Sequence, residues 1–585
     1  MGRGKKESLP DQFKDRNEKL INDPKNIANE FNNFFVNVGP DLAANITSTG
    51  KTYDQYLGEC VQNSMFMRPI VKKEIIEIIS KFDPNKSTGH DDIGNKIVKK
   101  VANEIAEPLE MIFNLSFATG KVPEHLKIAK VIPIYKKSDA ENLSNYRPVS
   151  VLPCFSKILE RLVFNRCVDF IDENDILNEQ QFGFRAKHST YMAIMQVIDK
   201  IHNAVELDKS TIGIFLDLSK AFDTIDHNIL LYKLQHYGFR GVVYEWFASY
   251  LNNRKQYVSF KNNKSDLMNI ICGVPQGSIL GPLLFILYVN DIVNTSNVFD
   301  FTLFADDTTI LYSHEDLETQ IPTINTELSE VSNWFKTNKL SVNASKTNFM
   351  ILGTSQMTDE YDGIDPLQII LDDTKLDRVK NTKFLGVVID ENISWKHHIN
   401  AISKTISRNI GVINKVKHFI PERILYSLYC SLVMPYINYG VLVWGNTHKT
   451  YVEKIFKLQK WAMRVISNSH YRSHTGPIFK KLKITNVYDT YQLELGVFMY
   501  KYSNGELPSS FNSFFTKRSD IHKYNTRHKH DYNHTRNKKH FSDHSVRTSG
   551  PILWSSDSMK DRVKKSKSIS HFRKHFKKQL ISEYK

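Results

Sequence analysis

Residues 215–223 read F-L-D-L-S-K-A-F-D, and residues 303–307 read L-F-A-D-D. The first stretch overlaps Thr211–Leu218, where β-branched and apolar residues predict a strand. The second lies between two short apolar runs within Phe301–Tyr312, a pattern typical of a β-hairpin with carboxylates at its turn. A strand and a hairpin that lie side by side would bring the carboxylates of both stretches together.

Three aspartates, Asp217, Asp306 and Asp307, are therefore the first candidates for chemistry. Mg²⁺ prefers carboxylate oxygens and completes its shell with water and substrate phosphates, so two or three such residues can hold two ions about 3.5–4 Å apart. Each aspartate alone has a plainer explanation. A pair of aspartates at a turn is usually turn chemistry, and an aspartate at a strand end can cap a helix. The surrounding sequence has to decide between these interpretations.

Helices and strands alternate irregularly with hairpins on both sides of these stretches, which predicts an α+β fold rather than a doubly wound sheet. Residues 1–60 are polar apart from an aromatic group within Phe31–Phe35, and the chain has no internal repeat. Spacing and capping residues predict helices at Val71–Ile79, at Ser189–Leu207, from Asp226 to about Gly238 and, buried, at Ile279–Val289, with a strand at Ala129–Tyr135.

Beyond residue 395 the pattern becomes helical. Isoleucines from Ile399 to Ile413 recur every three or four residues, which predicts an amphipathic helix. A second helix is predicted at Tyr451–Ile466, and the cations on or near its polar face are Lys454, Lys457, Lys460 and Arg464. Such a face is either solvated or a contact for phosphates. From about residue 517 the chain is rich in His, Lys, Asn and Ser, so we expect partial disorder there before a basic helix at Ser568–Leu580.

The chain is basic, with 78 Lys and Arg against 63 Asp and Glu, a formal charge of +15. That balance suits a polyanionic partner such as nucleic acid, although a basic protein without one fits equally well. The five cysteines are scattered and form no C-x-x-C pair, which argues against a zinc knuckle or a disulfide framework. The N-terminus lacks the apolar core of a signal peptide, and no apolar run is long enough to span a bilayer. We therefore expect the nucleus or the cytoplasm, and no membrane.

Seven stretches in order, between about residues 130 and 390, resemble the motifs of reverse transcriptases. Residues 215–223 and 303–307 are similar to the two catalytic motifs of that family, and G-V-P-Q-G-S-I-L-G-P at 273–282 resembles its P-Q-G motif. The other four are N-Y-R-P-V-S at 145–150, Q-F-G-F-R at 181–185, L-S-V-N-A-S-K-T at 340–347 and F-L-G-V-V-I-D at 384–390. They resemble, in turn, two fingers motifs, the later palm motif and the primer-grip hairpin. The amino-acid sequences of these motifs are similar to those of non-LTR retrotransposons, near the jockey and CR1 elements.

This resemblance implies an RNA-directed DNA polymerase that extends a 3′-hydroxyl primer on an RNA template. It implies a right-hand α+β fold with fingers, a palm with an antiparallel sheet, and a helical thumb. The expected divisions are a polar connector at 1–60, fingers and palm at 61–390 with a core of about 125–390, a thumb at 391–470, and a basic C-terminal region at 471–585. The implied partners are an RNA template, a DNA primer or target, dNTPs and two Mg²⁺ ions, for which Mn²⁺ could substitute.

The resemblance also implies a role for each aspartate of the two catalytic stretches. Asp217 and Asp306 would be bridging metal ligands, with Asp307 nearby. The main-chain carbonyl of Leu218 often serves as a further ligand in this family. Two Mg²⁺ ions held in this way would activate the primer hydroxyl and neutralise charge on the pyrophosphate.

Residues next to these stretches are expected to select the nucleotide. Phe222 falls where the family carries an aromatic steric gate that excludes a 2′-hydroxyl, with a core aromatic as the alternative. Its neighbour Asp223 is interpreted as structural or as part of the rim. Gln276 and Gly277 belong to a turn that allows close backbone approach to the nucleotide, because glycine has no Cβ.

Several basic residues have expected contacts with charged groups. Arg147, with Lys136 or its neighbour Lys137, would hold the triphosphate. Arg185 would either contact the template or brace the fingers. Lys346 would protonate or steady the departing pyrophosphate, and a surface lysine in a turn is the alternative.

The sequence departs from this family before the polymerase. Elements of this kind usually place an apurinic-type endonuclease there, whereas residues 25–45 resemble the connector that joins the two. We therefore expect a truncated copy or a partial gene product. Two alternative hypotheses about the function stay open. One is an inactive or domesticated copy that binds RNA without synthesis, and the other is a structural or DNA-binding protein that uses only its basic C-terminus.

Overall fold

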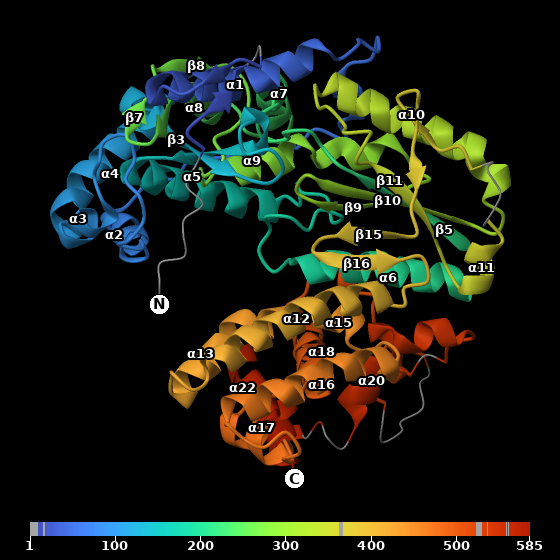
Figure 1. Cartoon of the computed structure of the whole chain (residues 1–585). Helices are drawn as coiled ribbons and strands as arrows, with labels where there is room; N and C mark the ends of the chain where they lie inside the picture. The colour runs from blue at the N-terminus through green and yellow to red at the C-terminus, as the bar shows by residue number, and fades with distance from the viewer. Residues whose placement is uncertain are drawn as a thin grey trace. The chain divides into compact units, whose positions relative to one another are not determined.

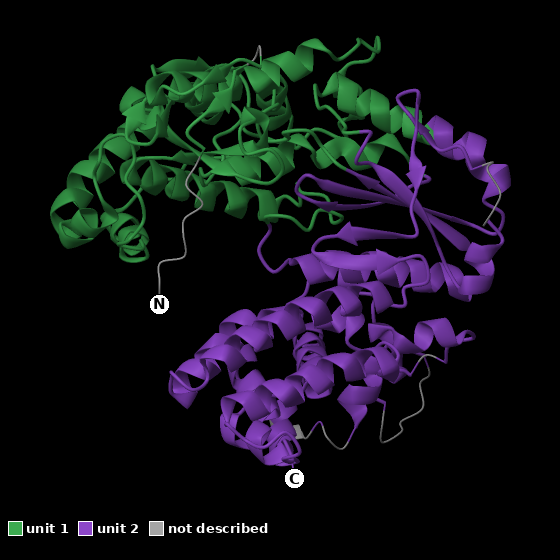
Figure 2. Cartoon of the chain, in the orientation of Figure 1, with its two compact units in different colours: residues 1–184, 217–297, 327–343 green, residues 185–216, 298–326, 344–585 purple. Residues whose placement is uncertain are grey.

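The computed structural model of the chain contains two compact units, which Figure 2 shows in green and purple. The first comprises residues 1–184, 217–297 and 327–343, and the second comprises residues 185–216, 298–326 and 344–585. The residues that the structure describes are 10–15, 18–361, 367–521, 529–534, 536–556, 559 and 561–584. Each unit combines helices with a mainly antiparallel sheet, so the predicted α+β class is confirmed.

The main sheet of the first unit has the strand order β4-β3-β6-β7, and β8 pairs with β6 as well. β3 (Ile128–Tyr135) runs antiparallel to β4 (Tyr146–Val151) and parallel to β6 (Arg254–Phe260). The short strands β7 (Asn263–Lys264) and β8 (Met268–Ile270) run antiparallel to β6. The strand predicted at Ala129–Tyr135 is confirmed as β3.

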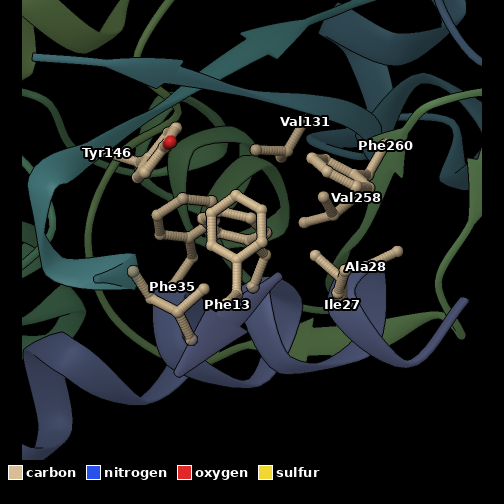
Figure 3. Packing of buried hydrophobic residues seen from close by; sticks show 10 residues of the cluster. Phe13, Ile27, Ala28, Phe35, Val131, Tyr146, Val258 and Phe260 are labelled. Atoms are coloured by element: carbon tan, nitrogen blue, oxygen red, sulfur yellow. The ribbon is translucent and has the colours of Figure 1, made fainter. Parts of the chain in front are cut away.

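Helix α1 (Pro24–Ala44) packs on this sheet and completes the buried cluster in Figure 3. The ring of Phe31 meets the rings of Phe13 and Tyr146 edge-on, in each case with 5.1 Å between centroids. The buried members are Phe13, Ile27, Ala28, Phe31, Phe35, Val131, Leu143, Tyr146, Val258 and Phe260. Part of the stretch expected to be a polar connector thus forms core with β3, β4 and β6. A helix with one apolar side is stabilised when that side is buried.

Further helices complete the first unit (Figure 1). They are α2 (Lys72–Ser80), α3 (Asn95–Lys100), α4 (Ala102–Thr119), α5 (Cys154–Glu173), α7 (His227–His236), α8 (Val242–Leu251) and α9 (Gly281–Tyr288). Asp226 caps α7, because its carboxylate accepts hydrogen bonds from the N–H groups of Asn228 and Ile229. The predicted helices near residues 71, 226 and 279 are therefore confirmed.

The main sheet of the second unit has the strand order β14-β11-β5-β10-β9. Its strands are β5 (Ser210–Leu216), β9 (Asp300–Phe304), β10 (Asp307–His314), β11 (Asn348–Leu352) and β14 (Asp377–Arg378). All pairs are antiparallel except β11 with β14. The predicted helix α6 (Thr190–Glu206) packs on β5, β9 and β10. The two predicted strands are confirmed as neighbours, with β5 ending two residues earlier than expected.

The helical part of the second unit follows the hairpin β15 (Asn381–Phe384) and β16 (Val387–Asp390). α12 (Lys396–Val416) buries the predicted stripe from Ile399 to Ile413 against β16 and α16 (Lys449–Ile466). The remaining helices of more than five residues are α13 (Glu422–Leu432), α17 (Gly476–Leu482), α18 (Val487–Ser503), α20 (Val546–Ser555) and α22 (Ile569–Ser582).

The C-terminal stretch is more ordered than predicted in its described part. α20 and α22 both pack on α18, and Phe572 and Phe576 of α22 are fully buried. Residues 522–528 of the His-rich stretch lie outside the described residues. Within residues 10–584, apart from the gaps given above, every helix is too short or too polar to cross a bilayer.

Short elements complete the chain. Those of the first unit are β1 (Phe13–Lys14) and β2 (Leu20–Ile21). Those of the second are α11 (Ser355–Asp359), β12 (Ile370–Leu371), β13 (Thr374–Lys375), α14 (Met434–Asn438), α15 (Val441–Trp444), α19 (Arg518–Ile521) and α21 (Asp561–Lys564). α10 (Ile321–Thr337) begins in the second unit and ends in the first.

Candidate active site

One end of the sheet in the second unit gathers the predicted catalytic side chains of that unit. Leu216, the last residue of β5, pairs with Thr308 near the start of β10, and Phe215 pairs with Asn348 at the start of β11. The turn before β10 carries Asp306, Asp307 begins β10, and the chain runs into β11 two residues after Lys346. The central strand β5 therefore ends beside the beginnings of both neighbours.

The β9–β10 turn is held in a strained conformation. Phe304 pairs with Asp307, which leaves a two-residue turn of Ala305 and Asp306. Ala305 has a φ of +58°, in the left-handed region that costs an L-residue about 1–2 kcal/mol. Strain of this kind persists where the surrounding sheet fixes the backbone, and it is often found at functional sites. Asp306 is half-buried and Asp307 is exposed.

In the first unit, the residues that follow β5 are held by a second predicted motif. The carbonyl of Asp217 accepts a hydrogen bond from the N–H of Asn343 at 2.8 Å, and Leu218 forms a β-bridge with Val342. Two sequence stretches predicted to belong to the site therefore pair through their backbones. In the described part of the chain, no group of three or more His, Cys, Asp or Glu side chains is arranged to hold a metal ion.

The backbone of Phe222 is hydrogen-bonded to the P-Q-G segment, and its ring packs on two other phenylalanines. The N–H of Val274 donates to the carbonyl of Phe222 at 2.9 Å. The Phe222 ring stacks on Phe285 of α9 at 4.7 Å between centroids and meets the edge of Phe184 at 6.2 Å. Phe222 is nevertheless only half-buried, so part of it stays accessible. This position fits a ring that is braced by the core and still contacts a ligand.

The turn at Gln276 and Gly277 is tied to β4. The N–H of Ser150 donates to the carbonyl of Gln276 at 2.8 Å. Gly277 has a φ of +128°, and a Cβ there would lie 2.4 Å from the Ser150 carbonyl oxygen, so any other residue would be strained at this position. Arg147 is exposed three residues earlier on β4. The first unit thus brings Arg147, Gln276, Gly277 and Phe222 into one neighbourhood.

The sequence did not predict the hydrogen-bond partner of the Asp223 side chain. The side-chain Nε2 of Gln276 donates to both carboxylate oxygens of Asp223, at 2.9 and 3.0 Å. Burial raises the pKa of Asp223 to about 6, although Gln276 and the cations Lys220 and Arg147 act in the opposite direction. The signal for this contact was its place beside Phe222, but spacing along the chain could not reveal a partner 53 residues away.

Comparison with known proteins shows what this arrangement belongs to. Residues 134–389 match the family described as "Reverse transcriptase (RNA-dependent DNA polymerase)". Residues 134–389 form a reverse transcriptase domain. This reverse transcriptase domain contains every residue predicted to contact metal or nucleotide, from Lys136 to Lys346.

Proteins similar to the chain come from mobile elements of Drosophila melanogaster. The chain is 27% identical over 463 residues to "Probable RNA-directed DNA polymerase from transposon X-element", and 28% identical over 453 residues to "RNA-directed DNA polymerase from mobile element jockey". It is 29% identical over 442 residues to "Probable RNA-directed DNA polymerase from transposon BS". The matches cover 77%, 75% and 73% of this chain but only 49%, 48% and 48% of the relatives. The chain thus spans about half their length.

Among solved structures, an apo telomerase from Candida tropicalis, truncated from its C-terminal domain, is 14% identical in sequence. The match covers 49% of this chain and 59% of that chain, with a TM-score of 0.33.

The predicted basic helix face lies outside the reverse transcriptase domain, on α16. Lys454 and Lys457 are exposed, and the Lys454 ammonium donates to the Asn400 side chain at 2.9 Å. The Lys460 ammonium instead lies 3.9 Å from the centroid of the Phe456 ring. Arg464 donates from Nε to the carbonyl of Ser473 at 2.9 Å. The four cations therefore do not form one uniform face.

Two cations of α12 lie beside this face and were not predicted. Lys404 and Arg408 line a shallow groove together with Lys454 of α16. The remaining predicted contact residues are Arg185, which is half-buried, and Lys136, which is exposed after β3.

Proposed function

We propose that the chain is an RNA-directed DNA polymerase that extends a 3′-hydroxyl primer on an RNA template with dNTPs, as a part of non-LTR retrotransposition. The observation that carries this proposal is the end of β5 beside the β9–β10 turn. Leu216 pairs with Thr308 there, and the chain continues from Leu216 directly into Asp217. The names of the three relatives above support the same activity.

In this proposal Asp217, Asp306 and Asp307 hold two Mg²⁺ ions, with the carbonyl of Leu218 as a further ligand. The donor set fits, because all the ligands are hard oxygens and Mg²⁺ takes its other ligands from water and substrate phosphates. Bound Mg²⁺ would promote loss of the primer hydroxyl proton and neutralise charge on the pyrophosphate. Mn²⁺ would be accepted in its place.

Residues that come before and after the catalytic aspartates in the sequence would position the nucleotide. Arg147 and Lys136 would contact the triphosphate, and Lys346 would supply a proton to the departing pyrophosphate. Gly277 would allow the backbone to approach the base pair, while Phe222 would exclude a 2′-hydroxyl. The half-buried position of Phe222 and the close contact of Gly277 with Ser150 support these roles.

The finer division of the fold is also part of the proposal. The antiparallel sheet around β5 would be the palm, and the strands β3 and β4 would belong to the fingers. The helices α12 and α16 would be the thumb, in which Lys404, Arg408 and Lys454 contact phosphates of an RNA–DNA duplex. Such contacts are sequence-neutral and weaken with salt.

Primer extension on an RNA template with Mg²⁺ and dNTPs tests the activity. Asp217→Asn and Asp306→Asn should each abolish extension and leave RNA binding nearly unchanged, because only the metal ligands are altered. Asp300→Asn is the matched control, since Asp300 begins β9 at the far end of the same hairpin and pairs with Lys200. Activity of either site variant within a few-fold of the control would contradict the metal assignment. A wild-type chain that binds RNA without extending a primer would favour the inactive copy.

A further inference from the structure

We propose that Asp223 is a positioning residue: its carboxylate fixes the orientation of the Gln276 carboxamide, so that Gln276 turns its oxygen, a hydrogen-bond acceptor, away from Asp223 and toward the incoming nucleotide. This inference rests on the polymerase function proposed above. It assigns a task to a half-buried carboxylate that neither metal binding nor phosphate binding uses.

The hydrogen bonds between the two side chains set this orientation. Nε2 of Gln276 lies 2.9 Å from Oδ1 and 3.0 Å from Oδ2 of Asp223. An ionised carboxylate only accepts hydrogen bonds, whereas the two ends of a carboxamide differ, one donating and one accepting. Rotating the amide by half a turn would place its oxygen against two carboxylate oxygens. The charge on Asp223 therefore selects one of the two amide orientations.

The backbone around Asp223 leaves little room for the pair to rearrange. A Cβ at Gly39 of α1 would lie 2.2 Å from the Asp223 carbonyl oxygen, and a Cβ at Gly273 would lie 2.9 Å from the Asp223 Cα. The thiol of Cys272 donates to the same carbonyl at 3.3 Å. The cavity beside the pair has a volume of about 30 Å³, which is room for roughly one water molecule.

The charged groups near the pair keep Asp223 ionised at neutral pH. The titratable and charged side chains of the surrounding elements are Lys220, Arg147, Cys272, Asp226, His227 and Lys339. Burial raises the pKa of Asp223 to about 6, and Gln276, Lys220 and Arg147 oppose that rise. Burial also raises the pKa of Cys272 to about 12, so this thiol stays neutral. Above pH 6 the pair is thus a carboxylate with an amide donor.

Protonation of Asp223 removes the preference for one orientation of the Gln276 amide. A carboxylic acid can donate to the amide oxygen, so below about pH 6 both orientations of Gln276 become acceptable. The rotated amide would present its NH₂ group at the place where the Gln276 carboxamide oxygen had accepted a hydrogen bond from the nucleotide. Nucleotide affinity should then fall as pH drops through the folded-state pKa of Asp223, while the metal ligands are untouched.

Steady-state primer extension by the full chain from pH 5 to 9 tests this. Asp223→Asn should raise the KM for dNTP roughly 10- to 100-fold at pH 8, the usual range for losing a hydrogen bond to a charged group, with a much smaller change in kcat. Asp169→Asn serves as the control, because Asp169 is an exposed carboxylate of the same unit. Relative to that control, the wild type should lose kcat/KM below about pH 6, and Asp223→Asn should not show this acid limb.

A double variant separates positioning from a general structural role. If Asp223 acts through Gln276, then Asp223→Asn combined with Gln276→Ala should be no worse than Gln276→Ala alone. KM does not depend on how much enzyme is folded, so partial unfolding cannot imitate the expected result. An unchanged KM and pH profile in Asp223→Asn, or full additivity in the double variant, would overturn this inference alone. A wild type that never extends a primer would overturn the proposed function and this inference with it.

Discussion

Asp291→Asn is expected to destabilise the first unit by about 3–5 kcal/mol, the usual cost of removing one partner from a buried ion pair. The side chains of Lys233 and Asp291 are 0% and 2% exposed, and their Nζ and Oδ1 atoms lie 2.5 Å apart. Nζ also donates to the Tyr288 carbonyl at 2.7 Å, and the Trp334 indole donates to the second carboxylate oxygen at 3.1 Å. Asparagine preserves the shape of the side chain but leaves the ammonium without a counter-charge.

The cost of this substitution should depend on pH. Burial lowers the pKa of Lys233, and Asp291 raises it, so the folded-state pKa falls further when Asp291 is replaced. A lysine with a folded pKa below its unfolded value loses stability as pH falls, because the unfolded chain binds more protons. The destabilisation in Asp291→Asn should therefore be large at neutral pH and shrink as pH rises toward the unfolded value of about 10.4.

Hydrogen exchange of peptides from α7 and α9 measures the free energy of local unfolding around the ion pair. It does not require the assumption that a chain with two units unfolds in a two-state manner. A cost of about 3–5 kcal/mol corresponds to exchange faster by roughly two to three and a half powers of ten. Lys233→Met added to Asp291→Asn should recover most of the loss, since neither charge then remains buried. Asp266→Asn, which breaks the exposed pair with Lys25, is the control. Equal effects of Asp291→Asn and this control, or additive losses in the double variant, would refute the reasoning.

Two further predictions concern the nucleotide and the duplex. Phe222→Val should raise rNTP use relative to dNTP use, because it opens space beneath the sugar, and the ratio of the two kcat/KM values measures this. An unchanged ratio with a lower Tm would make Phe222 a core residue only. Replacing Lys454, Lys457 and Lys460 with Gln should weaken duplex binding and reduce the log–log salt slope by a little under about 1 for each lost phosphate contact. Lys460 should contribute least, because it packs on Phe456, and an unchanged slope would mean that this face is solvated.

The strands and helices near the site were predictable because their signals are local. The alternation in residues 301–312 and the apolar run before Asp217 each describe one element, and their pairing followed from the expectation that the carboxylates converge. The same holds for α12, where the isoleucine spacing alone defines the buried side. The roles of Asp217, Asp306 and Asp307 stay predictions, because no contact in the structure tests them.

Contacts between distant segments could not be predicted in this way. Asp223 looks like a rim residue until Gln276 lies beside it, and Arg464 looks like a phosphate contact until it bonds the Ser473 carbonyl. Each depends on a partner that a single sequence does not indicate. Phe31 gave a partial signal, since a cluster of aromatics in a polar segment suggests burial, but not the surface that receives it.

Helix α1 lies before the residues that match the reverse transcriptase family, yet it shares a buried core with them. The matched domain begins at residue 134, yet Phe13 and Phe31 cover Tyr146, Val258 and Phe260, which would otherwise face water. An exchange of N-terminal segments between related elements would succeed only where the incoming segment brings an equivalent apolar helix. The region before the domain should therefore vary in its polar face and in length, while the pattern of large apolar side chains along α1 persists.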